Sequence, residues 1–120
     1  MISIAAANKA RVERILDALA DPTRRRIVEL LAASPMTASQ IHAAFPIANP
    51  AVSRHLRVLR EAGLIVERPV AGDRRVRLYA LERGGLDELA AWVAGVSSSW
   101  QEQLDAFEDY VGARSARATR

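Results

Sequence analysis

The sequence contains no cysteine, and this absence narrows its possible chemistry. Without thiols the chain can form no disulfide, thiolate metal site, cysteine nucleophile or thiol redox sensor. It also lacks the run of about 18 apolar residues that a membrane span needs, and the charged flank and apolar stretch of a signal peptide. We therefore expect a soluble, cytoplasmic protein with no membrane contact.

Lysine is almost absent too, because Lys9 is the only lysine among the 17 basic residues. Residues 50–79 contain seven arginines and three acids, a net charge of +4, whereas residues 82–109 contain one arginine and seven acids, a net charge of −6. A basic region followed by an acidic one favours a polyanion-binding surface on the first region, although two ordinary solvated faces would give the same pattern.

The chain length of 120 residues, half of them hydrophobic, suits a single domain with its own core. We expect this domain to cover residues 1–112 and residues 113–120 to form a disordered tail. Apolar periodicity and turn residues predict helices over residues 9–20, 22–33, a short segment from 38, 50–62 and 86–111, and strands over residues 64–70 and 75–81. The fold class is therefore mainly α with a small β-hairpin, in the order α-α-α-α-β-β-α.

Several helix boundaries carry specific capping signals. Asp21-Pro22 and Asn49-Pro50 each place a capping side chain before a proline, which suits the start of a helix. Thr37 and Gln40 have the spacing of a capping box, and Gly63 is expected to end the fourth helix in a left-handed conformation. Two short helices joined by a few residues predict a helix-turn-helix over residues 37–63.

The fourth predicted helix has two contrasting faces. At about 100° per residue its inward face holds Val52, Leu56 and Leu59. The opposite face holds Pro50, Ser53, Arg54, Arg57 and Glu61. Arginine can bind guanine edges or phosphates, serine adds a short polar contact, and a free helix N-terminus favours a phosphate, so this face suits the DNA major groove. An ordinary solvated face remains the alternative.

The predicted hairpin, which turns at residues 71–73, is basic near its tip. Arg74, Arg75 and Arg77 follow the turn, and in the second strand Val76, Leu78 and Ala80 alternate with Arg75, Arg77 and Tyr79. One strand face should pack on the helices while the other meets solvent or a ligand. A basic hairpin directly after a DNA-reading helix is typical of a wing that reaches the DNA backbone or minor groove, so residues 64–81 are interpreted as a wing.

The last predicted helix holds four of the chain's six aromatic residues. Its apolar side chains follow an a/d spacing, with a possible kink near residues 95–99. It could cover its own subunit, but a small domain can hardly bury so many aromatic rings, which favours a seam between two subunits. The residues expected at that dimer interface are Val12, Ile15, Leu16, Leu89, Val93, Trp100, Leu104 and Phe107. A two-fold dimer would place two reading helices about 34 Å apart and would bind a palindromic operator.

Two segments carry a family resemblance. LDALADPTRRRIVELL at residues 16–31 and PAVSRHLRVLREAGLI at residues 50–65 resemble the ArsR/SmtB family of winged-helix repressors, over about residues 10–81. Residues 89–111 resemble, more loosely, the last helix of a branch that does not sense metals. The resemblance implies a homodimer joined by its first and last helices, and operator contacts from Ser53, Arg54 and Arg57 helped by Gln40 and the wing. The full DNA-binding set we predict is Gln40, Asn49, Pro50, Ser53, Arg54, His55, Arg57, Arg74, Arg75 and Arg77.

Metal and catalytic sites are not expected. The only histidines, His42 and His55, supply too few ligands for zinc, and the cysteine or last-helix histidine ligands of metal-sensing relatives are missing. Ser53 and His55 would point about 200° apart on a helix, so they cannot form a nucleophile and base pair. There is no glycine-rich phosphate loop. We expect neither an enzyme nor a cofactor.

These features predict a homodimeric repressor or autorepressor that binds double-stranded DNA at an inverted repeat and does not respond to metals. Two alternatives stay open. The aromatic helix could serve a protein-interaction module, or an apolar small molecule could bind beneath the last helix and control a repressor. The sequence identifies neither the operator nor an effector, and it does not separate repression from activation.

Overall fold

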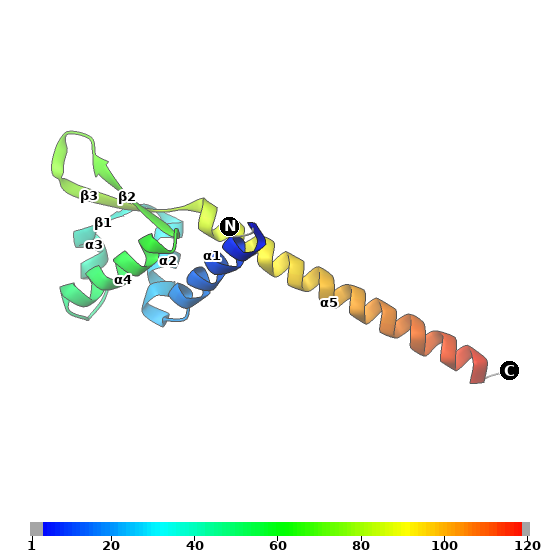
Figure 1. The fold of residues 1–120 in the computed structure, drawn as a ribbon. Helices are drawn as coiled ribbons and strands as arrows, with labels where there is room; N and C mark the ends of the chain where they lie inside the picture. The colour runs from blue at the N-terminus through cyan, green and yellow to red at the C-terminus, as the bar shows by residue number, and fades with distance from the viewer. Residues whose placement is uncertain (1–3, 119–120) are drawn as a thin grey trace. The chain divides into compact units, whose positions relative to one another are not determined.

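The computed structural model describes residues 4–118, which form five helices and a three-stranded antiparallel sheet with the strand order β1-β3-β2 (Figure 1). The elements are α1 Ile4–Leu19, α2 Pro22–Ala33, β1 Met36–Thr37, α3 Ala38–Ala43, α4 Asn49–Glu61, β2 Ile65–Val70, β3 Asp73–Leu81 and α5 Arg83–Ala118. The chain divides into two compact units, one up to Leu89 and one from Ala90. No helix within residues 4–118 is long and apolar enough to cross a membrane.

The capping signals of α2 and α3 act as predicted. The Asp21 carboxylate accepts a hydrogen bond of 3.1 Å from the backbone N–H of Arg24, and α2 covers the expected residues 22–33. At α3 the backbone N–H of Gln40 donates to the Thr37 hydroxyl at 3.3 Å, while the backbone N–H of Thr37 donates to the Gln40 side-chain oxygen at 2.8 Å. This reciprocal pair is the capping box that the sequence predicts.

The start of α4 differs from the prediction. The N-cap is Ala48, which makes no side-chain capping bond, and Asn49 is already helical. The carbonyl of Ala48 accepts hydrogen bonds from both Ala51 and Val52, so the helix begins one residue earlier than expected. Proline is tolerated anywhere in the first turn because its missing N–H has no partner to lose there. At the other end Gly63 adopts the predicted left-handed conformation, with φ of 77°.

The sheet contains the predicted hairpin and a strand that was not anticipated. Strands β2 and β3 pair in antiparallel register around a tight turn at Ala71 and Gly72, where Gly72 has φ of 85°. The short strand β1 pairs with β3 at Leu78 and Tyr79. The wing therefore belongs to a three-stranded sheet. Two residues are too few for an alternating pattern to be recognised in sequence, but they cover one edge of β3.

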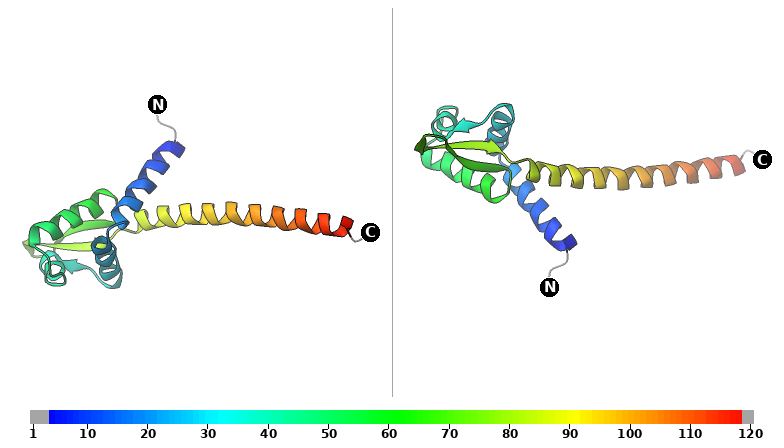
Figure 2. Two further views of the ribbon diagram at one scale, coloured as in Figure 1. Left: turned by 90° about the horizontal axis from the view of Figure 1, so that it is seen from below. Right: turned by 90° about the horizontal axis from the view of Figure 1, so that it is seen from above.

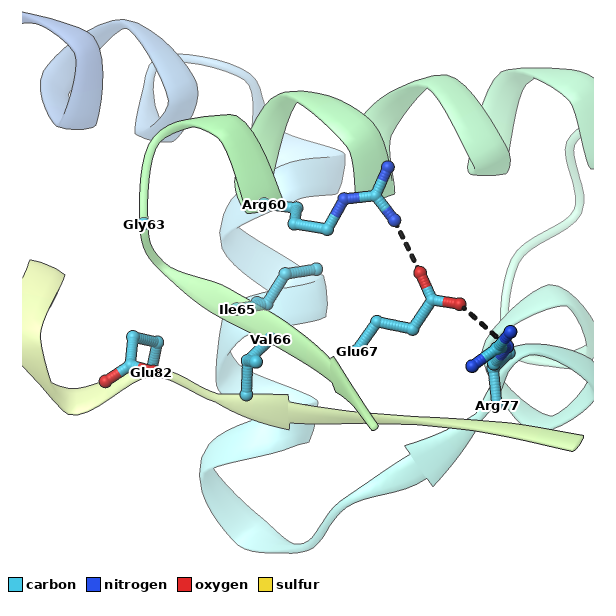
Figure 3. A pocket seen from close by; sticks show the side chains of 7 residues that line it. All are labelled: Arg60, Gly63, Ile65, Val66, Glu67, Arg77 and Glu82. Carbon is cyan, nitrogen blue, oxygen red and sulfur yellow. Dashed lines mark hydrogen bonds and ion pairs between the residues drawn. The ribbon is translucent and has the colours of Figure 1, made fainter. Parts of the chain in front are cut away.

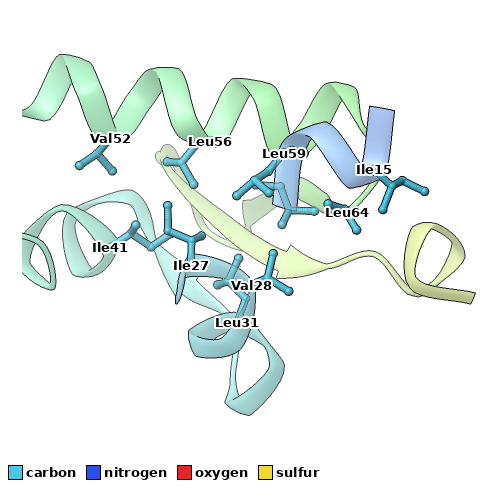
Figure 4. Close-up of a cluster of buried hydrophobic side chains, with 11 residues drawn as sticks. Ile15, Ile27, Val28, Leu31, Ile41, Val52, Leu56, Leu59 and Leu64 are labelled. Atoms are coloured by element: carbon cyan, nitrogen blue, oxygen red, sulfur yellow. The ribbon is translucent and has the colours of Figure 1, made fainter. Parts of the chain in front are cut away.

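The core lies between α1, α2, α3, α4 and the sheet (Figure 4). No polar or charged side chain is buried among the residues with described burial. The inward residues predicted for α4, namely Val52, Leu56 and Leu59, are 0%, 3% and 0% exposed. The cluster as a whole contains Ile15, Ala18, Ile27, Val28, Leu31, Ile41, Val52, Leu56, Leu59, Leu64 and Ile65.

The odd-numbered and even-numbered residues of β3 lie on opposite sides of the sheet. Tyr79 and Leu81 pack against the buried cluster, so the odd-numbered side of the strand faces the core. Arg77 lies on that same side of the strand, nearer the turn, where it pairs with Glu67 of β2. The core-facing side of the sheet therefore ends in charged residues beside α4.

The helix α5 begins three residues before the start predicted at residue 86. The helix begins at Arg83, because the Glu82 side chain accepts a 3.4 Å hydrogen bond from the N–H of Gly84 and so caps the first turn. Gly85 is required by close packing: a Cβ atom there would lie 2.4 Å from the carbonyl oxygen of Gly63. Gly85 therefore serves a close approach, and neither Gly84 nor Gly85 breaks the helix.

The far end of α5 also differs from the prediction. Residues 113–118 were expected to be disordered, but they are helical, whereas residues 119–120 lie outside the described residues. Alanine and arginine are strong helix formers, and a single glycine at position 112 does not stop the helix. The segment from Ala90 to Ala118 is one unbroken helix, with no division near residues 95–99 (Figure 2).

Candidate nucleic-acid interface

The outward face of α4 presents the predicted polar residues. Ser53, Arg54 and Arg57 are all exposed, on the side of the helix opposite the buried Val52 and Leu56. Within residues 4–118 neither Arg54 nor Arg57 makes an ion pair or a side-chain hydrogen bond, so both guanidinium groups are uncommitted. Uncommitted guanidinium groups on a rigid, well-packed helix can bind base edges or phosphates without breaking an existing contact.

The residues around the start of α4 are also exposed. Asn49 and Pro50 form the first turn and face solvent. Because no side chain caps this end, the Asn49 N–H lacks a capping partner in the part of the chain that is described, and such a helix end attracts an anion. Gln40 lies on α3, where its side-chain oxygen accepts a hydrogen bond in the capping box and its amide N–H groups are left for a ligand.

His55 is the predicted contact residue whose side chain the structure directs elsewhere. It is half-buried, and its Nδ1 lies 3.3 Å from a terminal nitrogen of Arg24 on α2. The same guanidinium donates to the carbonyl oxygens of Ala18 at 2.6 Å and Asp17 at 3.2 Å. Arg24 thus closes the C-terminal end of α1 and ties it to α4. His55 therefore joins α4 to α2 through Arg24, and its contact with DNA stays a prediction.

The Asp21 carboxylate lies next to Arg24 and His55, and its pKa is lowered. The N–H of Arg24 donates to it, and this bond, aided by the nearby His55 and the Arg24 charge, holds the pKa of Asp21 below its ordinary value against the opposing effect of burial. The carboxylate therefore stays ionised at the positive end of α2, where a negative charge is stabilising.

The arginines of the wing fall into two groups. Arg74 and Arg75, near the turn, are exposed and make no ion pair within the described chain. Arg77, further from the turn, has its Nε 3.3 Å from an oxygen of Glu67. Of the three wing arginines predicted to meet DNA, two are therefore free to do so and one is held by a carboxylate.

A charged group at the junction of α4 and the wing was missed in the sequence. Glu67 bridges Arg77 and Arg60, the latter from the last turns of α4 (Figure 3). Tyr79, which is paired with Glu67 across the two strands, has its pKa raised by burial and then by the Glu67 charge. The available signal was the spacing of Ser53, Arg57 and Arg60, which places Arg60 on the exposed stripe of α4.

The residues expected at a dimer interface are placed very differently from one another. Val12 and Ile15 are 8% and 1% exposed in the core of this single chain, so they are not available to a partner in this conformation. Leu89 is partly buried against the same core. Leu104 is half-buried. Leu16 on α1 is exposed, and so are Val93, Trp100 and Phe107 on α5.

The two histidines do not come together as ligands. His42 lies on α3, where its buried Nδ1 makes no hydrogen bond, and His55 contacts Arg24. Within residues 4–118 no three histidine or acidic side chains gather closely enough to hold a metal ion.

An α3–α4 pair with a free basic face, followed by a basic two-stranded hairpin on the same core, defines a winged helix-turn-helix DNA-binding protein. Residues 19–68 match the family model described as a helix-turn-helix domain. The chain is 40% identical over 99 residues to the HTH-type transcriptional regulator Rv2034 of Mycobacterium tuberculosis, an alignment covering 82% of this chain and 87% of that protein. It is 41% identical over 54 residues to the transcriptional repressor SdpR of Bacillus subtilis, covering 45% of this chain and 60% of that protein.

A solved structure described as an ArsR family transcriptional regulator, RHA00566, superposes with a TM-score of 0.70 at 31% identity. The match covers 78% of this chain and 93% of that one. The chain therefore belongs to the ArsR family of winged helix-turn-helix transcriptional regulators, as its sequence resemblance implied. It is a DNA-binding regulator of transcription and not an enzyme.

Proposed function

We propose that the protein is a homodimeric repressor that binds an inverted-repeat operator, with α4 in the major groove and the wing on the flanking backbone. The observation that carries this proposal is the pair of uncommitted arginines, Arg54 and Arg57, on the exposed face of α4. Arg74 and Arg75 on the wing add a second free basic element after it in the same compact unit.

The two elements have different roles in binding. Arg54, Arg57 and Ser53 lie on a helix fixed by its buried face, so they can read base edges in a defined register. The exposed Asn49 and Pro50 place the uncapped N-terminus of α4 where a phosphate can approach. The wing arginines bind phosphates and supply affinity without sequence information.

The dimer rests on the apolar side of α5. Trp100 is 64% exposed and Phe107 is 63% exposed, whereas large aromatic side chains on a stable single chain are normally covered. A second copy is the partner that always accompanies the chain, and a two-fold dimer gives two α4 helices the spacing of one DNA turn, about 34 Å. We propose that Leu16, Leu89, Val93, Trp100, Leu104 and Phe107 contribute to this interface.

Repression would follow from occupancy of a promoter, and the name of the Bacillus subtilis relative, a transcriptional repressor, supports this direction of control. The lack of cysteine and the separate positions of His42 and His55 support a regulator that does not respond to metals. The cytoplasmic location expected from the sequence stays a prediction.

Fluorescence anisotropy tests the proposal. The purified protein is titrated against the DNA upstream of its own gene and against a scrambled duplex of equal length, at several salt concentrations. We expect tight binding to the upstream DNA alone, at one dimer per palindrome, with a log–log salt slope of about −5 or steeper for six or more phosphate contacts. Weak and equal binding to both duplexes would overturn the proposal.

A further inference from the structure

The junction between α4 and the wing holds a three-residue ion-pair group. One Glu67 carboxylate oxygen lies 3.3 Å from Nε of Arg77 on β3, and the other accepts a hydrogen bond from a terminal nitrogen of Arg60 on α4 (Figure 3). Glu67 is the most enclosed member, with its side chain 24% exposed, against 46% for Arg60 and 53% for Arg77. Each arginine gives one nitrogen to the carboxylate and keeps other N–H groups toward solvent.

The group lies in a surface hollow of about 590 Å³. Arg60 continues the stripe of Ser53 and Arg57 along α4, and Arg77 continues the basic side of the wing from Arg75. The two arginines therefore lie where the proposed DNA-reading face of α4 passes into the wing. The residues that line the hollow are Arg60, Gly63, Ile65, Val66, Glu67, Arg77 and Glu82.

We propose that Glu67 limits DNA affinity by occupying Arg77 and a further phosphate-binding residue, Arg60, both of which a DNA backbone must take from it. This inference rests on the proposed function and identifies how its interface is restrained. The carboxylate neutralises one of the two positive charges and holds both guanidinium groups in place. Because the pairs are partly exposed, they contribute little to stability, and a phosphate can replace the carboxylate.

Phosphate contacts carry no sequence information, so this restraint acts mainly on non-specific binding. Each phosphate newly neutralised adds about 0.9 to the magnitude of the log–log salt slope. Replacing Glu67 with the isosteric, uncharged glutamine releases both arginines. For Glu67→Gln we expect a slope steeper by about one to two, and binding of any duplex about three- to tenfold tighter at 0.1 M salt.

The experiment compares wild type, Glu67→Gln and Glu82→Gln on a 30-base-pair duplex of arbitrary sequence, by anisotropy at several salt concentrations. Glu82 lines the same hollow but pairs with neither arginine, and glutamine keeps its acceptor for the Gly84 N–H. Glu82→Gln therefore removes the same charge without freeing Arg60 or Arg77. We expect its slope to match that of wild type. In the double variant Glu67→Gln/Arg77→Gln about half of the gain in slope should be lost.

Three results would overturn the inference: weaker binding by Glu67→Gln, an unchanged slope, or an equal gain in Glu82→Gln. A thermal melt of each variant identifies any loss of fold. A Glu67→Gln variant that is unfolded at the assay temperature would itself contradict the weak stabilising role assigned to the pairs. If wild type binds neither this duplex nor the upstream DNA, the proposed function fails together with this inference. If wild type binds and Glu67→Gln does not differ from it, only the inference fails.

Discussion

The unit up to Leu89 and the helix from Ala90 onward differ in how far their large apolar side chains are buried. The first unit places large side chains such as Ile27, Ile41 and Leu59 out of contact with water, at 0% exposure. In the second, Trp100, Phe107 and Tyr110 are at least 60% exposed. The first unit is therefore stabilised by its own core, whereas the apolar side of the helix needs a surface from outside the chain's described contacts.

Charge changes sign shortly before this division, between β3 and α5. Residues 50–79, which contain α4 and the wing, have a net charge of +4, and residues 82–109 have a net charge of −6. A DNA-binding surface needs the first sign, and the second sign is repelled by phosphate. The comparison therefore separates a DNA-binding unit with its own core from a helix for which we propose a role in association.

The largest expected effect tests the self-sufficient core. Leu59→Ala removes a fully buried side chain of α4, and we expect it to lower the free energy of unfolding by about 2–5 kcal/mol because a cavity remains. Urea denaturation followed by circular dichroism measures this loss. Ile47→Ala, at a loop residue 38% exposed, is the control and should cost less than about 1 kcal/mol. Similar losses for the two variants would contradict the assigned core.

The second test concerns the helix from Ala90. Phe107→Ala removes one exposed ring of the proposed interface, and we expect self-association to weaken about tenfold or more, as at other aromatic interface centres. Sedimentation equilibrium measures the dissociation constant. Asp109→Ala, two residues along on the polar side of the helix, should leave it nearly unchanged. An unaltered dimer in Phe107→Ala would remove the basis for assigning this helix to association.

A smaller effect is expected at the cap of α2. Asp21→Ala should cost about 1 kcal/mol of stability at neutral pH, whereas Asp21→Asn, which keeps an acceptor, should cost less. The folded pKa of Asp21 lies below its unfolded value, so its contribution is present above the unfolded pKa, about 4, and disappears as the pH falls through the folded pKa. Chemical denaturation at pH 7 and pH 3 should show the difference between wild type and Asp21→Ala shrinking at the lower pH. A constant difference would contradict an ionised cap.

Local signals made the first unit largely predictable from sequence. The Asp21 cap, the Thr37–Gln40 box and the inward residues of α4 depend on neighbours a few positions away, and the structure confirms them. The cap predicted at Asn49 is wrong, because proline is tolerated throughout the first turn and so does not fix which residue precedes the helix. Sequence spacing cannot decide between Ala48 and Asn49 as the N-cap.

What could not be predicted depends on contacts between distant residues. Strand β1 forms only because β3 is brought beside it, and the close approach of Gly85 to Gly63 cannot be seen in sequence. The bridge from Arg60 through Glu67 to Arg77 joins three elements, as does the contact of Arg24 with His55. The candidate site was therefore predicted as a set of exposed residues, but which of them are free and which are restrained needed the structure.

The most direct test of the account is the DNA affinity of Arg54→Ala/Arg57→Ala beside Arg114→Ala/Arg117→Ala, which removes the same charge from the end of α5. Anisotropy against the upstream DNA should give at least a tenfold loss for the first variant, with a salt slope shallower by about two. The second variant should bind like wild type, and both should remain dimers. Equal losses in the two variants, or no loss in the first, would contradict the assignment of the α4 face as the DNA-reading surface.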